Sequence, residues 1–377
     1  TPIYYINSSP HIGHSYTSIA CDILARYNKL LGNDVYFLSG TDEHGQKVEQ
    51  AAINQSLKPQ DFADKMSIQF KDLISFLNCE TNDFIRTTET RHKKAAQALW
   101  NKLLDNNQIY LSNYEGWYSI RDEAFYSENE LIKKDGKFIA PSGAEVEWIK
   151  EESYFFKLSE WQDRLIDFYN NNPKSILPVS RFNEVLSFIK SGLKDLSVSR
   201  TTFKWGIPVP NNPKHVMYVW IDALCNYLTS IGYPDENSAN FKNYWPALHV
   251  VGKDILRFHS VYWPAFLMAA GLDPPLRVFA HGWWTNEGEK ISKSLGNVID
   301  PYEIVSKYGL DQIRFFLFRE VPFGNDGDFS KDAIAQRLNA DLSNNYGNLV
   351  QRICSFVKKN CDCKIFNNFD NNEDDNI

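Results

Sequence analysis

The chain has 377 residues, 43% of them hydrophobic and 14% aromatic, which predicts two or three domains with large buried cores. A net charge of −7 argues against a protein that coats nucleic acid without specificity, so no DNA partner is expected. The sequence contains no run of about 18 apolar residues that would cross a membrane, and no secretory signal is visible. These features predict a soluble, cytoplasmic protein with no membrane partner.

Six cysteines are spread along the chain without a CxxC pair. The one close pair, CDC at residues 361–363, does not have the spacing of a zinc knuckle. We therefore expect free thiols, mostly buried in cores, in a reducing compartment. The positions are Cys21, Cys79, Cys225, Cys354, Cys361 and Cys363.

The first 45 residues alternate between strand and helix patterns. TPIYYIN at residues 1–7 is β-branched and aromatic and predicts a buried strand. From His14 onward, apolar residues recur at helical spacing as far as Gly32 and Asn33. DVYFLSG at residues 34–40 predicts a second strand, followed by the polar loop TDEHG at residues 41–45. This alternation predicts a parallel α/β sheet, which binds ligands at the carboxyl ends of its strands.

The pattern changes between residues 106 and 215, where aromatic, turn-rich segments such as GWYSIRDEAFY predict a largely β inserted module. Strand–helix alternation resumes over 216–282, so residues 1–105 and 216–282 are expected to be the two halves of one domain. After Lys293 the sequence is helical, with Asp300 as an N-cap before Pro301 and long periodicity over 331–358. The predicted fold class is α/β: a Rossmann-like parallel sheet domain split by a β-rich insertion, followed by a helical C-terminal region.

Two histidines, His11 and His14, lie three residues apart in PHIGHSY at residues 10–16, on one face at the expected start of a helix. Unpaired amide N–H groups and the positive end of the helix dipole make such a start an anion site. The imidazoles add donors, and Gly13 lets a bulky ligand approach the backbone. This chemistry suits a nucleotide whose phosphates are attacked, although the tetrapeptide alone also fits a metal pair or two structural histidines.

A second polar segment, EKISKSLGN at residues 289–297, carries Lys290 and Lys293 on a loop between Gly288 and Gly296. Lysine is a mobile point charge suited to pyrophosphate, and flanking glycines allow a loop to close over a ligand. Alone, this segment also fits a solvated basic loop. Together with HIGH, it favours a nucleotide site.

The pair HIGH and KISKS resembles the HIGH and KMSKS signatures of the class I aminoacyl-tRNA synthetases, with Ile291 in the place of Met. More narrowly, the chain is similar to the methionyl-tRNA synthetases along essentially its whole length. The stretches that carry this resemblance are TPIYYINSSPHIGH, GTDEHGQK, GWYSIRDEAFY, ESYFFKLS, KWGIPVP, YVWIDALCNY, VGKDILRFHSVYWPAFL and GEKISKSLGNVIDP.

The resemblance implies a role for each matching position. The catalytic residues would be His11, His14, Lys290 and Lys293, and ATP would be bound by these four with Gly13, Gly252 and Asp254. The methionine pocket would be formed by Ile3, Tyr5, Asp42, Trp220, Ala223, Leu224, Tyr227, Ile255, His259 and Trp263. The tRNA anticodon would be contacted by Asn344, Asn348 and Arg352. A thioether does fit an aromatic cage and an ammonium does fit a fixed carboxylate, although each aromatic residue taken singly also fits ordinary core packing.

The resemblance also assigns the C-terminal regions. Residues 283–330 would hold the KISKS loop and the contact with the tRNA stem, and 331–377 would be the incomplete start of a helical anticodon-binding domain. A chain of this extent is expected to make methionyl-adenylate but to charge tRNA poorly. The helix at 331–358 is expected to pack on the catalytic body or on helices outside this chain, because one amphipathic helix cannot bury its own apolar stripe.

One departure from the family concerns zinc. Many relatives hold zinc with CxxC knuckles in the inserted module, whereas this stretch has Ser119 and Asp122, and IAPSGAEVEW contains no cysteine. Because the soft ligands are missing, we expect no structural zinc and no other bound metal except the Mg²⁺ that accompanies ATP.

The implied reaction uses ATP, Mg²⁺ and L-methionine to make methionyl-adenylate and then charges tRNA(Met), with no covalent enzyme intermediate. One alternative is another adenylate-forming enzyme of the HIGH type, similar to pantothenate synthetase, which the helix at 331–358 disfavours. Another is an inactive RNA-binding protein of the same fold, which the intact motifs disfavour. A dinucleotide oxidoreductase is excluded, because no GxGxxG follows the first strand.

Overall fold

The computed structural model describes residues 1–121, 124–126, 128–134, 136–291 and 297–364. Two three-stranded parallel sheets form the centre of the fold, in the orders β1-β2-β3 and β14-β15-β9. The predicted parallel α/β architecture is therefore confirmed. The first sheet contains β1 (Tyr4–Tyr5), β2 (Leu38–Asp42) and β3 (Asp83–Arg86), and the second contains β9 (Ile176–Leu177), β14 (Leu248–Gly252) and β15 (Arg277–His281).

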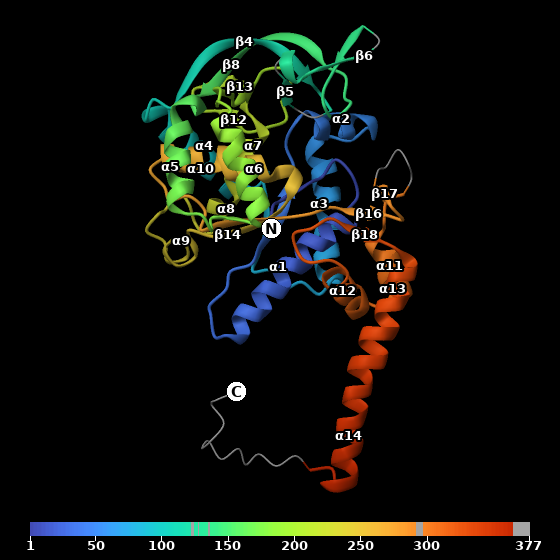
Figure 1. Cartoon of the computed structure of the whole chain (residues 1–377). Coiled ribbons are helices and arrows are strands. Elements are labelled where there is room, and N and C mark those ends of the chain that lie inside the picture. The colour runs from blue at the N-terminus through green and yellow to red at the C-terminus, as the bar shows by residue number, and fades with distance from the viewer. Residues whose placement is uncertain (122–123, 127, 135, 292–296, 365–377) are drawn as a thin grey trace.

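Helices connect and cover these strands (Figure 1). In the first half they are α1 (Ile12–Leu30), α2 (Gln46–Asn54), α3 (Pro59–Phe76) and α4 (Thr90–Asp105). In the second half they are α7 (Val219–Leu224), α8 (Asn226–Thr229), α9 (Ala239–Tyr244) and α10 (Trp263–Ala269), with a 3₁₀ turn at Lys253–Ile255 and a π-helical turn at Phe258–Tyr262.

The N-terminal half of α1 carries the buried residues Ile12, Tyr16 and Ile19, so the predicted helix packs its first turns into the core. Its last turns leave the core, and Figure 1 shows this end projecting from the body. Leu30 is 86% exposed and Tyr27 is 59% exposed, although both belong to the apolar pattern that predicts the helix. Helical periodicity therefore locates α1 but does not show where burial ends along it.

The inserted region contains a long antiparallel pair, β4 (Ile109–Ser119) with β8 (Glu147–Phe156), in a sheet of order β10-β8-β4-β5. The other strands are β5 (Ala124–Tyr126), β6 (Ile132–Lys134), β7 (Lys137–Ile139), β10 (Leu196–Ser197), β11 (Ser199–Arg200), β12 (Pro208–Val209) and β13 (Asn212–Met217), and short 3₁₀ turns lie at Glu128–Glu130 and Leu158–Trp161. This part agrees with a β-rich insertion.

The middle of the 106–215 range differs from a largely β module. It forms α5 (Gln162–Asn171) and α6 (Val179–Lys190), with β9 between them. Strand β9 pairs in parallel with β15, so this stretch adds a strand to the second parallel sheet. The reason is packing: Leu165, Ile176 and Ile189 are fully buried in the same core as β15, which a pattern read along the chain does not reveal.

The C-terminal region begins with a small sheet and continues in helices. The sheet contains β16 (Trp284–Asn286), β17 (Glu289–Lys290) and β18 (Gly327–Phe329), and the helices are α11 (Pro301–Tyr308), α12 (Leu310–Arg319), α13 (Lys331–Arg337) and α14 (Asn348–Asn360), with a π-helical segment at Leu338–Gly347. As predicted, Asp300 caps α11, and its side chain accepts from the Tyr302 N–H at 2.8 Å.

Helix α14 projects away from the rest of the molecule (Figure 1). The helix expected over 331–358 is therefore split between two settings: its first part, α13, packs on the core through the buried Ile334, whereas α14 projects from it. The apolar stripe of α14 is exposed over Leu349, Val350, Ile353 and Phe356, and Tyr346, just before the helix, is exposed as well. Two cysteines in and after α14, Cys354 and Cys363, are also exposed, so the expectation of mostly buried thiols is wrong for them.

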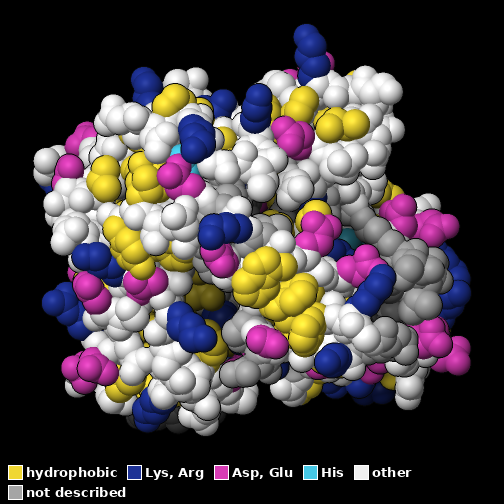
Figure 2. All heavy atoms as spheres, turned by 90° about the horizontal axis from the view of Figure 1, so that it is seen from above, with side chains coloured by type: hydrophobic (Ala, Val, Ile, Leu, Met, Phe, Trp, Pro, Cys, Tyr) yellow, Lys and Arg dark blue, Asp and Glu magenta, His cyan; other side chains and the backbone are white. Residues whose placement is uncertain are grey.

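Charged side chains are mixed on the face shown in Figure 2, where Lys and Arg alternate with Asp and Glu. Among the described side chains on this face, Lys and Arg do not gather into an extended basic patch.

Candidate active site

A cavity of about 810 Å³ lies at the carboxyl ends of four parallel strands. Tyr5, Asp42, Gly252 and His281 are the last residues of β1, β2, β14 and β15, and all four line it. The register pairs Tyr5 with Asp42 and Gly252 with His281, so each pair is brought side by side by its sheet. The site therefore lies where the parallel-sheet rule predicts it.

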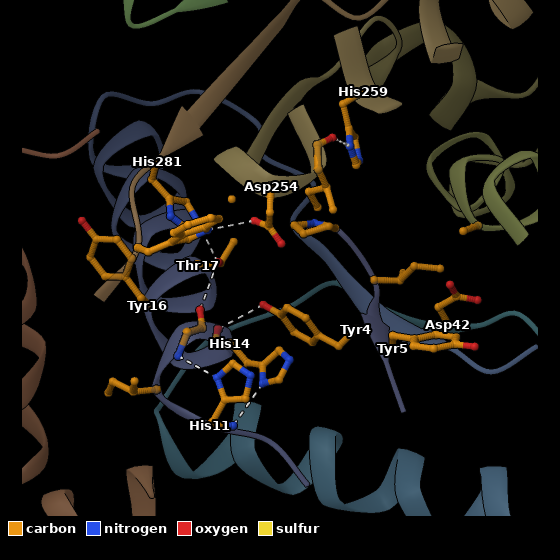
Figure 3. A pocket seen from close by; sticks show the side chains of 18 of the residues that line it. Tyr4, Tyr5, His11, His14, Tyr16, Thr17, Asp42, Asp254, His259 and His281 are labelled. Atoms are coloured by element: carbon orange, nitrogen blue, oxygen red, sulfur yellow. Dashed lines mark hydrogen bonds between the residues drawn. The ribbon is translucent and has the colours of Figure 1, made fainter. Parts of the chain in front are cut away.

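Most of the residues predicted for ATP and methionine meet in this cavity (Figure 3). These are Ile3, Tyr5, His11, Gly13, His14, Asp42, Trp220, Ala223, Leu224, Tyr227, Gly252, Asp254, Ile255 and His259. The cavity is also lined by residues that the sequence analysis did not single out: Tyr4, Tyr16, Thr17, Lys47, Asn226, His281, Trp283 and Trp284. For Trp283 and Trp284 the signal was present, since both follow directly after the strand that ends at His281.

The two histidines of HIGH cap the start of α1. His11 is the N-cap residue, and its Nδ1 accepts from the Gly13 N–H at 3.1 Å. The His14 Nδ1 accepts from the His11 N–H at 3.0 Å, and the two rings lie 3.9 Å apart. Because both Nδ1 atoms accept, the proton of each neutral ring is on Nε2, the nitrogen that can donate to a ligand.

Besides the predicted approach of a ligand, the packing of the His11 ring also favours a glycine at position 13. A Cβ at this position would lie 3.0 Å from Cε1 of the His11 ring, closer than ordinary contacts. Glycine therefore leaves room for the ring that caps the helix. The helix start is also tied to the segment after the KISKS loop, since the Ile12 N–H donates to the Ile299 carbonyl at 3.2 Å.

The two lysines of KISKS are only partly covered by the structure. The backbone of Lys290 lies in β17, where it pairs with Thr285, but its side chain is outside the described part of the chain. Lys293 lies entirely outside the described residues. Ile291, between them, lines the cavity, so this segment borders the same space as HIGH.

Gly252 and Asp254 lie against each other at the end of β14. A Cβ on Gly252 would lie 2.5 Å from Oδ1 of Asp254, so this carboxylate folds back over the strand end in the space that glycine leaves. The Trp283 indole N–H donates to the same Oδ1 at 3.3 Å. Lys253 lies over the Trp283 ring, 4.3 Å from its centroid, and its ammonium pairs with Asp326 at 2.6 Å.

Thr17 and His281 connect α1 to β15 beside the cavity. The His281 Nδ1 donates to the Gly282 carbonyl at 2.9 Å, and its Nε2 lies 2.8 Å from the Thr17 hydroxyl, which also lies within donating distance of the Gly13 carbonyl at 3.2 Å. Burial lowers the pKa of His281, and the bond to Gly282 offsets part of this shift. This histidine is thus held in one tautomer at the foot of the cavity.

Tyr227 and His259 form a hydrogen-bonded pair at the other end. The His259 Nδ1 donates to the Ile255 carbonyl at 2.9 Å, so Nε2 accepts from the Tyr227 hydroxyl at 2.8 Å. Burial lowers the pKa of His259 to about 4, which keeps the ring neutral at pH 7. His259 lies in the π-helical turn, a distortion that often marks functional sites.

Trp220 forms the aromatic wall, stacked on Phe258 with ring centroids 3.5 Å apart and planes within 7°. Trp263, predicted to complete the pocket, is placed differently. It is fully buried behind the cavity lining, and its indole N–H donates to His249 at 3.3 Å. Trp263 thus contacts the ring of Tyr227 from behind, at 6.3 Å between centroids.

The loop that carries Asp42 is fixed by its neighbour Glu43. The buried Glu43 carboxylate accepts from Arg86 at 2.7 and 3.0 Å and from the Thr88 hydroxyl at 2.5 Å. Its carbonyl accepts from the Trp205 indole N–H at 2.5 Å. A buried carboxylate satisfied on both oxygens holds a loop in one conformation.

The predicted anticodon residues belong to the C-terminal helical stretch that ends in the projecting α14 (Figure 1), and none of them is among the residues that line the cavity. Asn344 belongs to the π-helical segment, and Asn348 and Arg352 belong to α14. All three are exposed, and the Asn348 side chain donates to the Asn344 carbonyl at 2.7 Å.

Among the residues that the structure describes, no group of three or more His, Cys, Asp or Glu side chains is arranged to hold a metal ion. In the same part of the chain, no helix combines the length and apolar character needed to span a membrane.

Comparisons with known proteins identify the family of this chain. The family model of class I tRNA synthetases (M) matches residues 1–354. The methionine--tRNA ligase of Rickettsia conorii is 62% identical over 366 residues, which are 97% of this chain and 71% of the relative. That of Brucella suis is 57% identical over 367 residues, with the same shares.

Among solved structures, Mycobacterium tuberculosis methionyl-tRNA synthetase bound by methionyl-adenylate matches with a TM-score of 0.92 at 51% identity, over 96% of this chain and 72% of that chain. The apo form of that enzyme matches with a TM-score of 0.82 at 46% identity, over 96% and 70% of the two chains. The chain therefore belongs to the methionyl-tRNA synthetases, within the class I tRNA synthetases.

Proposed function

We propose that this protein activates L-methionine with ATP, giving methionyl-adenylate and pyrophosphate, and then transfers methionine to tRNA(Met). Family membership supports this function. The observation that carries it is a single cavity lined by the two helix-capping histidines of HIGH, by the carboxylates Asp42 and Asp254, and by an aromatic wall. Such a cavity can hold a nucleotide and an amino acid side by side.

The first step is an in-line displacement at phosphorus. A carboxylate oxygen of methionine attacks the α-phosphate of ATP, and pyrophosphate leaves with the electron pair of the broken P–O bond. Catalysis then consists of positioning and of stabilising the extra charge on the phosphate oxygens. We assign this role to the Nε2–H groups of His11 and His14, to the start of α1, and to Lys290 and Lys293.

Methionine would lie between β1, β2 and α7, with its ammonium on Asp42 and its thioether against Trp220 and Tyr227. A flexible thioether packs well on aromatic edges and faces. The remaining wall is assigned to Ile3, Tyr5, Ala223, Leu224, Ile255 and His259, which line the cavity, with Trp263 supporting it from behind.

Adenosine would lie at the ends of β14 and β15, held by Asp254 and by the backbone at Gly252 and Gly13. Among the described residues that line the cavity, Asp42 and Asp254 are the ones with carboxylates, and we have assigned them to the methionine ammonium and to adenosine. Mg²⁺ would therefore be held chiefly by the phosphate oxygens of ATP and by water, as this hard cation prefers. It would supply charge neutralisation on the leaving pyrophosphate.

The regions beyond the cavity complete the proposal. We assign residues 106–215 to a zinc-free inserted module, because residues 106–215 contain no cysteine. Residues 1–105 and 216–282 would form the catalytic domain, to which the 106–215 range adds β9, and 283–330 would hold the KISKS loop and tRNA stem contact and 331–377 the start of the anticodon-binding region. Asn344, Asn348 and Arg352 would read the anticodon, in a protein that works in the cytoplasm.

Aminoacylation tests this function against both alternatives. The protein is mixed with ATP, Mg²⁺, labelled methionine and a tRNA(Met) transcript, and acid-precipitable label is measured together with methionine-dependent pyrophosphate exchange. Exchange and charging are both expected. Exchange driven by a small hydroxy acid and not by methionine would favour the pantothenate synthetase-like alternative. Binding of tRNA without either reaction would favour the inactive RNA-binding alternative.

A further inference from the structure

A fully buried carboxylate, Asp222, accepts hydrogen bonds from two histidines beside the methionine end of the cavity. Its Oδ2 lies 2.6 Å from the His44 Nδ1, and its Oδ1 lies 2.7 Å from the His92 Nε2. Both imidazoles are buried as well. Burial raises the pKa of Asp222, but the two histidines outweigh it and hold the pKa at about 2, so the group is an anion at neutral pH.

The three residues come from three different elements. Asp222 lies on α7, His92 lies in the first turn of α4, and His44 belongs to the loop that follows β2. In sequence, Asp222 is 178 residues from His44 and 130 from His92. The Thr229 hydroxyl, on α8, lies 3.1 Å from the His92 Nδ1 and extends the connection. A buried network of this kind favours one relative placement of its elements.

The bond between His44 and Asp222 joins two segments that line the cavity, although neither residue lines it itself. Asp42 lines the cavity two residues before His44, and Ala223 lines it directly after Asp222. Neither Asp222, His44 nor His92 is among the lining residues. The network therefore fixes the distance between two walls without touching what lies between them.

The rest of the loop is already held on the opposite side, because Glu43 is bound by Arg86 and Thr88. The ring of His44 also packs edge-on against Trp205, with 5.4 Å between centroids. Glu43 thus ties one side of the loop to β3 and the residues after it, and the bond from His44 to Asp222 ties the other side to α7. The walls that carry Asp42 and Trp220 are thus placed relative to each other before a ligand binds.

We propose that Asp222 is a positioning residue for methionine: through His44 and His92 it sets the separation between the Asp42 loop and helix α7. Methionine must reach Asp42 with its ammonium and the α7 wall with its side chain at the same time, so this separation determines how well both contacts form. The inference rests on the proposed function, and it adds a residue that makes no contact with the substrate.

Asp222→Asn tests it, because an asparagine has one acceptor oxygen for the two histidines. We expect the methionine Kd, measured by calorimetry without ATP, to rise about tenfold or more, since small misplacements of binding groups cost that much. The KM for ATP in pyrophosphate exchange should change by less than about twofold, because the nucleotide end does not depend on this separation.

A matched control is Asp22→Asn. Asp22 is also fully buried and also pairs with two cationic side chains, Arg26 and Arg314, but unlike Asp222 it has no cavity-lining residue directly beside it in the chain. Both variants should lower the Tm, whereas Asp22→Asn should leave the methionine Kd unchanged. An equal rise of the Kd in both variants would show general loosening and overturn the proposal, and so would a normal Kd in Asp222→Asn.

A second pair of variants decides the matter if Asp222→Asn does not fold. His92→Ala removes a donor to Asp222, and His92→Gln returns an amide N–H near the same place. The methionine Kd should rise in His92→Ala and fall back toward the wild-type value in His92→Gln. Equal values in the two variants would overturn the proposal. A wild-type protein that binds no methionine would instead overturn the proposed function.

Discussion

Replacing Gly252 by alanine should weaken ATP binding through Asp254. The backbone at Gly252 has φ −68° and ψ 149°, which alanine adopts without strain, so the fold should be kept. The new Cβ would lie 2.5 Å from Oδ1 of Asp254, and the carboxylate must move away from the Trp283 indole that donates to it. A displaced Asp254 carboxylate would also lose its proposed hydrogen bond to adenosine. Losing one hydrogen bond of a charged group costs about 1.5–3 kcal/mol, which predicts a KM for ATP about 10- to 100-fold higher.

The assay is pyrophosphate exchange at saturating methionine with ATP varied, together with a methionine titration. The methionine Kd should not change. The matched control is Asp254→Asn, alone and combined with Gly252→Ala, because two changes that act on one group are not additive. If Gly252→Ala raises the KM for ATP by the same factor in the Asp254→Asn background, or not at all in the wild type, the reasoning from the close approach is wrong.

Three further predictions concern the KISKS loop, the buried His259 and the inserted module. Lys293→Ala should lower the exchange rate at saturating substrates about 100-fold or more with methionine binding near normal, because its charge would act on the transition state; full turnover with weakened methionine binding would contradict this. His259 has a pKa of about 4 in the fold against 6.5 unfolded, so the unfolded chain binds more protons between these values and stability falls as the pH drops. Urea unfolding at pH 7 and pH 5 should show a loss of roughly 2 kcal/mol from this residue that is absent in His259→Gln, and an equal loss in both proteins would refute it. Elemental analysis should find no stoichiometric zinc, whereas about one zinc per chain, lost with folding on chelation, would overturn that assignment.

The sequence predicts those parts of the site that local chemistry determines. Two histidines at a helix start, a glycine between them and the end of a β-branched strand are all short-range features, and the parallel-sheet rule then gathers the strand ends. Tyr5, Asp42 and Gly252 lie where this rule predicts. The same kind of reasoning gave the Asp300 cap of α11.

Features that depend on long-range packing are not visible in the sequence. An aromatic pattern does not distinguish a cavity wall from the layer behind it, and Trp263 belongs to that layer. Strand β9 joins the parallel sheet from within a range that reads as an insertion, because its burial is decided by β15, about 100 residues away. The bond of Asp222 to His44 likewise joins positions that no local pattern connects.

Amino-acid-dependent pyrophosphate exchange, measured on one preparation with each amino acid in turn, tests the central claim most directly. The cavity lined by Tyr5, Trp220 and Tyr227 predicts that methionine drives exchange far above leucine, isoleucine and valine. Exchange with leucine equal to or greater than that with methionine would contradict the methionine assignment and leave only the class of enzyme.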